Sequence, residues 1–139
     1  MTIQYSVAVR NAKLNAVETE IGTTPLIEIR TGAAPADCAA AATGNVLVQQ
    51  ALPSDWLAAA SGGAKAIGSG PWALTALTNI ATSNAGYFRI HRAGSPSVCD
   101  MQGTITATGG GGDMTLDNIS IAASQAVNVT AFTITAGNA

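Results

Sequence analysis

The sequence contains few charged residues, few aromatic residues, two cysteines and one histidine, and these shortages exclude several classes of protein. Charged residues make up 10% of the chain, whereas an average soluble domain carries about 25%. Six Lys and Arg residues against eight Asp and Glu residues do not form the basic surface that nucleic-acid binding requires. The shortage of charge also argues against a long coiled coil, because the outer positions of such helices are charged.

The two cysteines, Cys38 and Cys99, allow either of two states. They are free thiols if the protein stays in a reducing cytoplasm, or they form a late disulfide that closes a loop of about 60 residues. Two distant cysteines and one histidine do not have the spacing of a closed zinc site. We therefore expect no metal and no other cofactor.

What the chain does contain is small and apolar: hydrophobic residues make up 47% of its 139 residues, and about a fifth of the chain is alanine. With a net charge of −2, this composition argues against disorder, and the length suits one domain over residues 1–139. Alanine burial contributes little transfer free energy, so oligomerisation or docking onto a partner would add stability. The start of the chain lacks the pattern of a secretory signal, and its apolar runs are too short to span a membrane.

Residues 5–21 have the apolar periodicity of a helix. The apolar stripe consists of Val7, Leu14, Val17 and Ile21. Ser6 precedes the pattern and Gly22 follows it. Serine caps the first turn of a helix well, and glycine commonly follows the last turn. The competing prediction is a strand over residues 3–9, in which every second side chain is apolar or aromatic.

Residues 24–139 are predicted to form a β-rich body, because short alternating runs are separated by Gly and Pro turns. The predicted strands cover residues 25–31, 46–52, 72–80, 87–92, 98–108, 113–116, 119–121 and 127–135. Residues 87–92 and 98–106 are predicted to pair as a hairpin, with Phe88 and Ile90 on one face. One helix followed by such strands predicts a mainly β fold, either a β-sandwich or a jelly-roll-like domain.

No group of residues forms a recognisable catalytic site, so we expect no enzyme activity. His91 is the one histidine, no G-x-S-x-G motif accompanies it, and its place next to Arg92 predicts an exposed strand residue. Residues 63–69 lack the lysine that a P-loop places after its second glycine. The four glycines of residues 109–112 are not followed by a helix, so they predict a hairpin tip or a close backbone approach rather than a phosphate site.

Two further features leave alternatives open. Asp113 and Asp117 resemble part of a calcium loop but lack the spacing of an EF-hand, which leaves a weak surface calcium site as the alternative. Trp56 and Trp72 are predicted to anchor the core. The alternative for these aromatic residues, together with Tyr87, is an exposed platform for a sugar or a protein.

Three stretches of the sequence carry a resemblance to a known family, and they are residues 5–22 (YSVAVRNAKLNAVETEIG), 29–35 (IRTGAAP) and 103–118 (GTITATGGGGDMTLDN). The strand-rich end, residues 131–139 (AFTITAGNA), extends the likeness over most of the chain. Together they resemble a family of small virion structural proteins of tailed bacteriophages and prophages. The resemblance implies a virion component, made in the cytoplasm of the bacterial host, and it implies no catalytic motif.

The resemblance does not fix the place in the particle. Because small decoration proteins are often compact β domains, we expect a capsid decoration (cement) protein that binds the major capsid protein, stabilises the head shell and forms homo-oligomers. The stripe of Leu14, Val17 and Ile21 is the candidate docking surface, unless it packs on the chain's own sheet. One alternative is a virion protein associated with the tail, baseplate or fibre. A further alternative, of another class, is a carbohydrate- or receptor-binding module.

Overall fold

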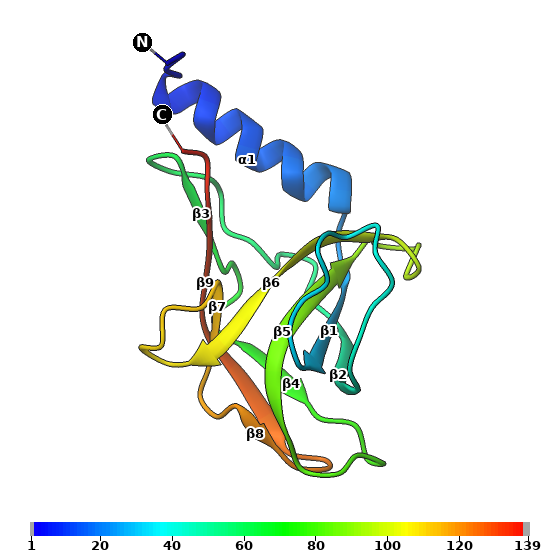
Figure 1. Ribbon diagram of the computed structural model, residues 1–139. Coiled ribbons are helices and arrows are strands. Elements are labelled where there is room, and N and C mark those ends of the chain that lie inside the picture. The colour runs from blue at the N-terminus through cyan, green and yellow to red at the C-terminus, as the bar shows by residue number, and fades with distance from the viewer. Residues whose placement is uncertain (1, 138–139) are drawn as a thin grey trace.

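The computed structural model describes residues 2–137, and it consists of one N-terminal helix followed by a β-rich body (Figure 1). The prediction of a mainly β, sandwich-like fold with a single N-terminal helix is therefore confirmed. The helix runs along one end of the body, and the sheet curls beneath it.

Helix α1 (Val7–Ile21) begins and ends at the signals that the sequence carries. Ser6 has extended backbone, and its side chain accepts a hydrogen bond from the amide of Val9 at 3.3 Å. At the other end Gly22 has φ +90°, and its amide donates to the carbonyl of Glu18 at 2.8 Å. Because Ser6 is the cap, the helix starts two residues later than predicted, and the competing strand over residues 3–9 does not form.

Nine strands follow the helix, most of them short. They are β1 (Leu26–Thr31), β2 (Val46–Ala51), β3 (Ala64–Ala66), β4 (Trp72–Thr75), β5 (Ser83–His91), β6 (Cys99–Ala107), β7 (Met114–Leu116), β8 (Ser120–Ile121) and β9 (Ala126–Thr135). The strand order is β2-β1-β5-β6-β7-β9-β3, with β4 paired to β9 and β8 paired to β5. The strand predicted over residues 72–80 is thus shorter in the structure, because it ends at Thr75.

The centre of the sheet is formed by β1, β5 and β6, and it confirms the predicted hairpin. Tyr87 on β5 lies opposite Thr104 on β6, and the pairing is antiparallel. Phe88 and Ile90 point into the core as predicted, where they are 1% and 0% exposed. Side chains at alternate positions of the same strands point to the outer face of the sheet, and that face holds the groups discussed below.

The sheet closes on itself. Strand β4 pairs with β9, and beyond its end Ala76 forms an antiparallel bridge with Val48 on β2. Next to this bridge the amide of Leu77 donates to the carbonyl of Leu47 at 2.9 Å. The inner face of the closed sheet surrounds one hydrophobic core. Its largest buried side chains are Trp56, Trp72, Phe88, Ile27, Ile29, Leu47, Leu52, Leu57, Ile90 and Met114.

In the second half one prediction is wrong, and one strand departs from simple alternation. Residues 109–112 do not form a hairpin tip, because β6 and β7 run parallel. The predicted close approach is present: a Cβ on Gly110 would lie 2.7 Å from the side chain of Thr106. In β9, strict alternation would place Val129 and Phe132 on different faces of the strand, yet both are buried. The pairing of β7 with β9 shifts register between Thr115 and Leu116, next to these two residues. A bulge of this kind returns the following residues to the inner face.

Candidate functional site

The stripe of Leu14, Val17 and Ile21 faces the body of the protein. Leu14 and Ile21 are 4% and 3% exposed, and Val17 is half-buried against the core. The expected docking surface on these three residues is therefore wrong in its main part, because the chain's own body covers them. Parts of Val17 and Ile21 still line a surface hollow, together with Lys13, Ala16, Glu20 and Asp100.

Polar contacts hold the same face of α1 to the body. Lys65, on β3, is 2% exposed, and its ammonium group lies 2.7 Å from a carboxylate oxygen of Glu18. The same ammonium donates to the side-chain oxygen of Asn15 at 3.0 Å, and Asn15 also accepts from the amide of Ala60 at 3.2 Å. A buried lysine needs such partners, because an unpaired buried charge is strongly destabilising. The helix therefore has a defined inner face.

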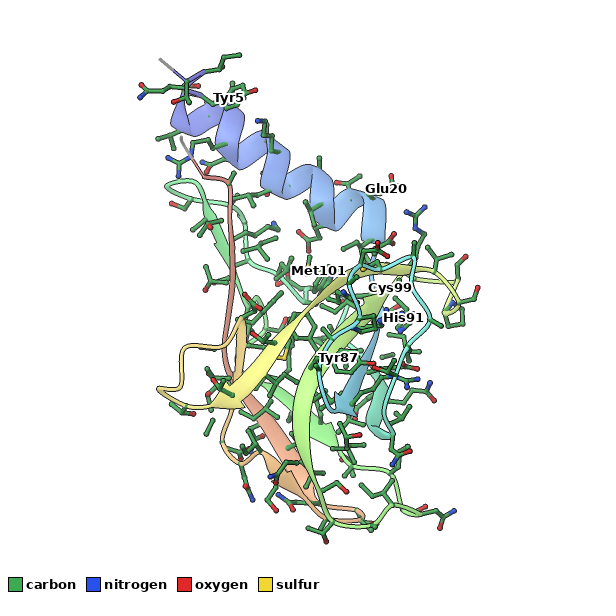
Figure 2. All side chains as sticks on the ribbon, in the orientation of Figure 1. Tyr5, Glu20, Tyr87, His91, Cys99 and Met101 are labelled. Carbon is green, nitrogen blue, oxygen red and sulfur yellow. The ribbon has the colours of Figure 1, made fainter. Side chains whose placement is uncertain are left out.

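Large apolar side chains are exposed at the start of α1 and in the residues just before it. Ile3, Tyr5, Val7 and Val9 are 77%, 40%, 49% and 43% exposed. The Lys13 ammonium lies 3.3 Å from the centre of the Tyr5 ring, in a cation–π contact. Figure 2 shows Tyr5 at the end of α1 remote from Tyr87, His91 and Cys99. We call residues 3–9 the N-terminal apolar segment.

The sequence did not predict docking through the N-terminal apolar segment. The signal that could have revealed it is the presence of four large apolar residues within residues 3–9, which was weighed only as evidence for a strand. Four large apolar side chains are exposed within these seven residues, with Val7 and Val9 on different sides of the first helical turn, and a concentration of exposed apolar side chains is typical of an interaction surface. The segment therefore replaces the predicted stripe as the candidate docking site.

A second site lies on the outer face of β1, β5 and β6, where the loop of residues 32–44 lies across the sheet. We call this loop the strap. The Tyr87 hydroxyl donates to the carbonyl of Thr43 at 2.6 Å and accepts from the amide of Thr43 at 3.0 Å. Tyr87 is 0% exposed although it is on the outer face, because the strap covers it. The strap is therefore a packed part of the fold.

Two further side chains of the sheet hold the middle of the strap. Arg89 donates from Nη2 to the carbonyls of Asp37 at 3.2 Å and Ala40 at 2.8 Å. Gln102 donates to the carbonyl of Pro35 at 2.7 Å and accepts from Nε of Arg89 at 3.1 Å. Arg89 is 4% exposed, so its charge is compensated by backbone carbonyls of the strap.

The strap also brings the two cysteines together. The sulfur atoms of Cys38, on the strap, and Cys99, the first residue of β6, lie 2.8 Å apart, and both residues are half-buried thiols. Burial, together with the contact with Cys38, raises the pKa of the Cys99 thiol to about 12. The sequence left free thiols and a disulfide as alternatives, and the structure places these thiols side by side.

His91 is buried, so the expectation of an exposed strand residue is wrong. It is 7% exposed, and Nε2 lies 3.4 Å from a carboxylate oxygen of Glu28 on β1. Within residues 2–137 neither ring nitrogen has a hydrogen-bond partner. The misassignment arose because His91 does point to the outer face, as predicted, and the alternation gave no sign that other segments cover that face.

Glu28 is held ionised by its neighbours. Burial acts to raise the pKa of this carboxyl, but hydrogen bonds from Arg30 and Gln49 and the positive charge of Arg30 outweigh burial, so the pKa is lowered. The hydrogen bonds are 2.9 Å from Arg30 and 2.8 Å from Gln49. A carboxylate engaged in this way forms a structural ion pair with Arg30.

The two aspartates considered for calcium are used by the chain itself. Asp113 accepts hydrogen bonds from the amide and the hydroxyl of Thr104, both at 2.8 Å, and these contacts lower its pKa. Asp117 accepts from the side-chain amide of Asn128 at 2.8 Å. In the part of the chain that the structure describes, no three His, Cys, Asp or Glu side chains are grouped as metal ligands.

The tryptophans are core residues, as predicted. Trp56 and Trp72 are 0% and 2% exposed, and their indole nitrogens donate to the carbonyls of Gly22 and Trp56 respectively, both at 3.1 Å. Tyr87 lies beneath the strap. The alternative of an exposed aromatic platform is therefore wrong, because these rings present no face to solvent.

Comparison with known proteins gives no match to a family model, to a curated protein or to a solved structure. Among the described residues, helical structure of the length and apolar character needed to cross a bilayer is absent.

Proposed function

We propose that this chain is a structural protein of a tailed-phage virion, where it decorates the head shell by binding the major capsid protein. The proposal combines the resemblance of residues 5–22, 29–35 and 103–118 to small virion proteins with the placement of the exposed apolar side chains. The single observation that carries it is the N-terminal apolar segment, whose large side chains are exposed while the rest of α1 is held to the body.

The chemistry of this segment suits binding to another protein. Ile3, Val7 and Val9 expose between 43% and 77% of their surface, and their burial against a partner would be favourable at about 25 cal/mol per Å². None of these side chains carries a charge that would need to be desolvated. The Glu18–Lys65 ion pair and the buried Leu14 hold the body at a fixed place relative to the segment.

A decoration protein does not need high affinity for a single site. Many copies on a regular shell contribute together, because neighbouring copies raise the effective concentration at the surface. A weakly charged outer surface of Thr, Ser, Ala and Gly lets such neighbours approach without strong repulsion, and the net charge of this chain is −2. Homo-oligomerisation on the shell belongs to the same proposal.

The test is co-sedimentation of purified chain with heads of the phage that encodes it, using variants of the segment and a matched control. Ile3→Asp and Val7→Asp place a charge in the N-terminal apolar segment, and Val7→Asp keeps the helix intact because an acidic residue suits its first turn. Val98→Asp is the control, since Val98 is 41% exposed but lies in the β5–β6 connection.

We expect each segment variant to weaken binding to heads by about tenfold or more, whereas Val98→Asp binds like the unmodified chain. Equal binding of all three variants would remove the segment from the account. Binding to isolated tails and not to heads would replace the decoration role by the tail, baseplate or fibre role.

A further inference from the structure

Cys38 and Cys99 are brought together by a framework that does not involve their sulfur atoms. The strap is held to the sheet by Tyr87, Arg89 and Gln102, through five hydrogen bonds to residues 35–43. This framework leaves the two sulfurs 2.8 Å apart, although 61 positions separate the residues in the chain. A disulfide bond is about 2.05 Å long, so a small movement suffices to form it.

We propose that Cys38 and Cys99 are a redox site, at which a disulfide closes and locks the strap onto β6 when the protein meets a low-molecular-weight disulfide such as oxidised glutathione. The proposal does not depend on the role in the virion. It assigns a covalent modification to the two thiols, and the fold without the disulfide is already arranged to receive it.

The reaction is two thiol–disulfide exchanges. The thiolate of one cysteine attacks a sulfur of oxidised glutathione, so a protein–glutathione disulfide forms and one glutathione thiolate leaves. The thiolate of the other cysteine then attacks the protein sulfur of that mixed disulfide, and the second glutathione leaves. In sum two protein thiols are oxidised to one disulfide, one oxidised glutathione is reduced to two glutathiones, and the protons of the protein thiols pass to them.

The surroundings of Cys99 make the exchange slow at neutral pH. The attacking species is the thiolate, and burial together with the contact with Cys38 raises the pKa of Cys99 to about 12, so this thiol is rarely ionised. Slow exchange suits a bond that is absent in a reducing environment and forms on longer exposure to an oxidising one. Once Cys38 carries glutathione, the neighbouring Cys99 needs no encounter in solution.

The disulfide would hold the strap in place over the buried side chain of Arg89. Beneath and beside the strap lie Arg89 and His91, which are 4% and 7% exposed. Arg89 depends on the strap carbonyls of Asp37 and Ala40 as acceptors. If the strap moves away from the sheet, the buried charge of Arg89 loses these two hydrogen-bond acceptors. A disulfide at Cys38 would keep the acceptors in place.

The experiment oxidises the purified full chain in glutathione buffers of graded ratio, followed by alkylation of the remaining thiols and mass spectrometry of tryptic peptides. Cleavage after Arg30, Lys65 and Arg92 places Cys38 in residues 31–65 and Cys99 in residues 93–139, so the bond is seen as one linked pair of peptides. The matched control moves one thiol by one position on the strap, with the double substitution Cys38→Ala and Ala39→Cys.

We expect the linked pair in the unmodified chain, with both thiols lost together. The control keeps two thiols and nearly the same loop, but its thiol is displaced from Cys99, and we expect at least about tenfold less linked product at the same glutathione ratio because disulfide geometry is strict. Two alkylatable thiols in the unmodified chain at every ratio, glutathione adducts without the linked pair, or equal linkage in the control would each overturn the proposal. Circular dichroism of every variant establishes that it is folded.

Discussion

The hydroxyl of Tyr87 donates to the carbonyl of Thr43 at 2.6 Å and accepts from the amide of the same residue at 3.0 Å. One side chain of β5 thus replaces both hydrogen bonds that a neighbouring strand would supply to Thr43. This contact fixes the end of the strap, and it explains how a segment rich in Ala, Gly and Pro lies ordered on the sheet.

Removal of that hydroxyl is expected to loosen the strap without disturbing the core. Tyr87→Phe leaves the ring in place and removes two hydrogen bonds, so we expect a loss of about 1–3 kcal/mol in the free energy of unfolding. Amides of residues 33–44 should exchange with deuterium faster than in the unmodified chain. Unchanged exchange in the strap would contradict this role of Tyr87.

The disulfide proposed between Cys38 and Cys99 has a thermodynamic consequence. A bond that closes a loop of 61 positions is expected to add about 4 kcal/mol to the free energy of unfolding by the chain-entropy model. Urea unfolding of the oxidised and reduced chain measures the difference, and Cys99→Ser should behave alike in both buffers. An oxidised form with the linked peptides but no higher midpoint would show that the bond adds strain equal to its benefit.

The buried Lys65 makes Glu18 more important than its neighbour Glu20. Glu18→Gln leaves the ammonium of Lys65, which is 2% exposed, with Asn15 as its remaining side-chain partner. We expect a loss of about 2 kcal/mol, below the 3–5 kcal/mol of a fully buried pair because Glu18 is partly exposed. Glu20→Gln is the control, since its pair with Arg92 is solvent-exposed, and it should leave the urea midpoint unchanged. Equal effects would mean that Lys65 does not need Glu18.

The ionisation of Glu28 predicts a dependence of stability on acid. Its pKa is lowered in the folded state from 4.5, because the contacts of Arg30, Gln49 and His91 outweigh burial. The unfolded chain therefore binds the proton first as pH falls, so the contribution of Glu28 is fully present above the unfolded pKa and is lost as pH falls through the folded pKa. Urea midpoints between about pH 3 and pH 7 should fall less steeply on the acid side in Glu28→Gln. Parallel curves would contradict the assignment.

Sequence patterns were sufficient to predict those helices and strands whose ends and buried faces are set by residues close to them in the chain. Ser6 and Gly22 limit α1, and the alternation of Phe88 and Ile90 orients the β5–β6 hairpin. The phase of β9 could not be predicted, since a bulge beside Leu116 returns Phe132 to the core. Register of this kind is set by the partner strand.

The candidate sites were harder to predict than the fold, for a physical reason. Alternation tells which residues share a face, but it does not tell what lies over that face. His91 was therefore expected in solvent, and Leu14 and Ile21 were expected at a partner, because periodicity does not show that the strap lies over the sheet or that the body lies beneath α1. The proximity of Cys38 and Cys99 depends on the same strap.

The central claim is that the chain decorates a phage head, and cryo-electron microscopy of heads mixed with the purified chain tests it most directly. We predict extra density at symmetry-related positions on the outer surface of the shell, with the N-terminal apolar segment toward the shell and the β body outward. The Ile3→Asp variant should leave the same heads bare. Density confined to the tail, or heads that stay bare with the unmodified chain, would contradict the account.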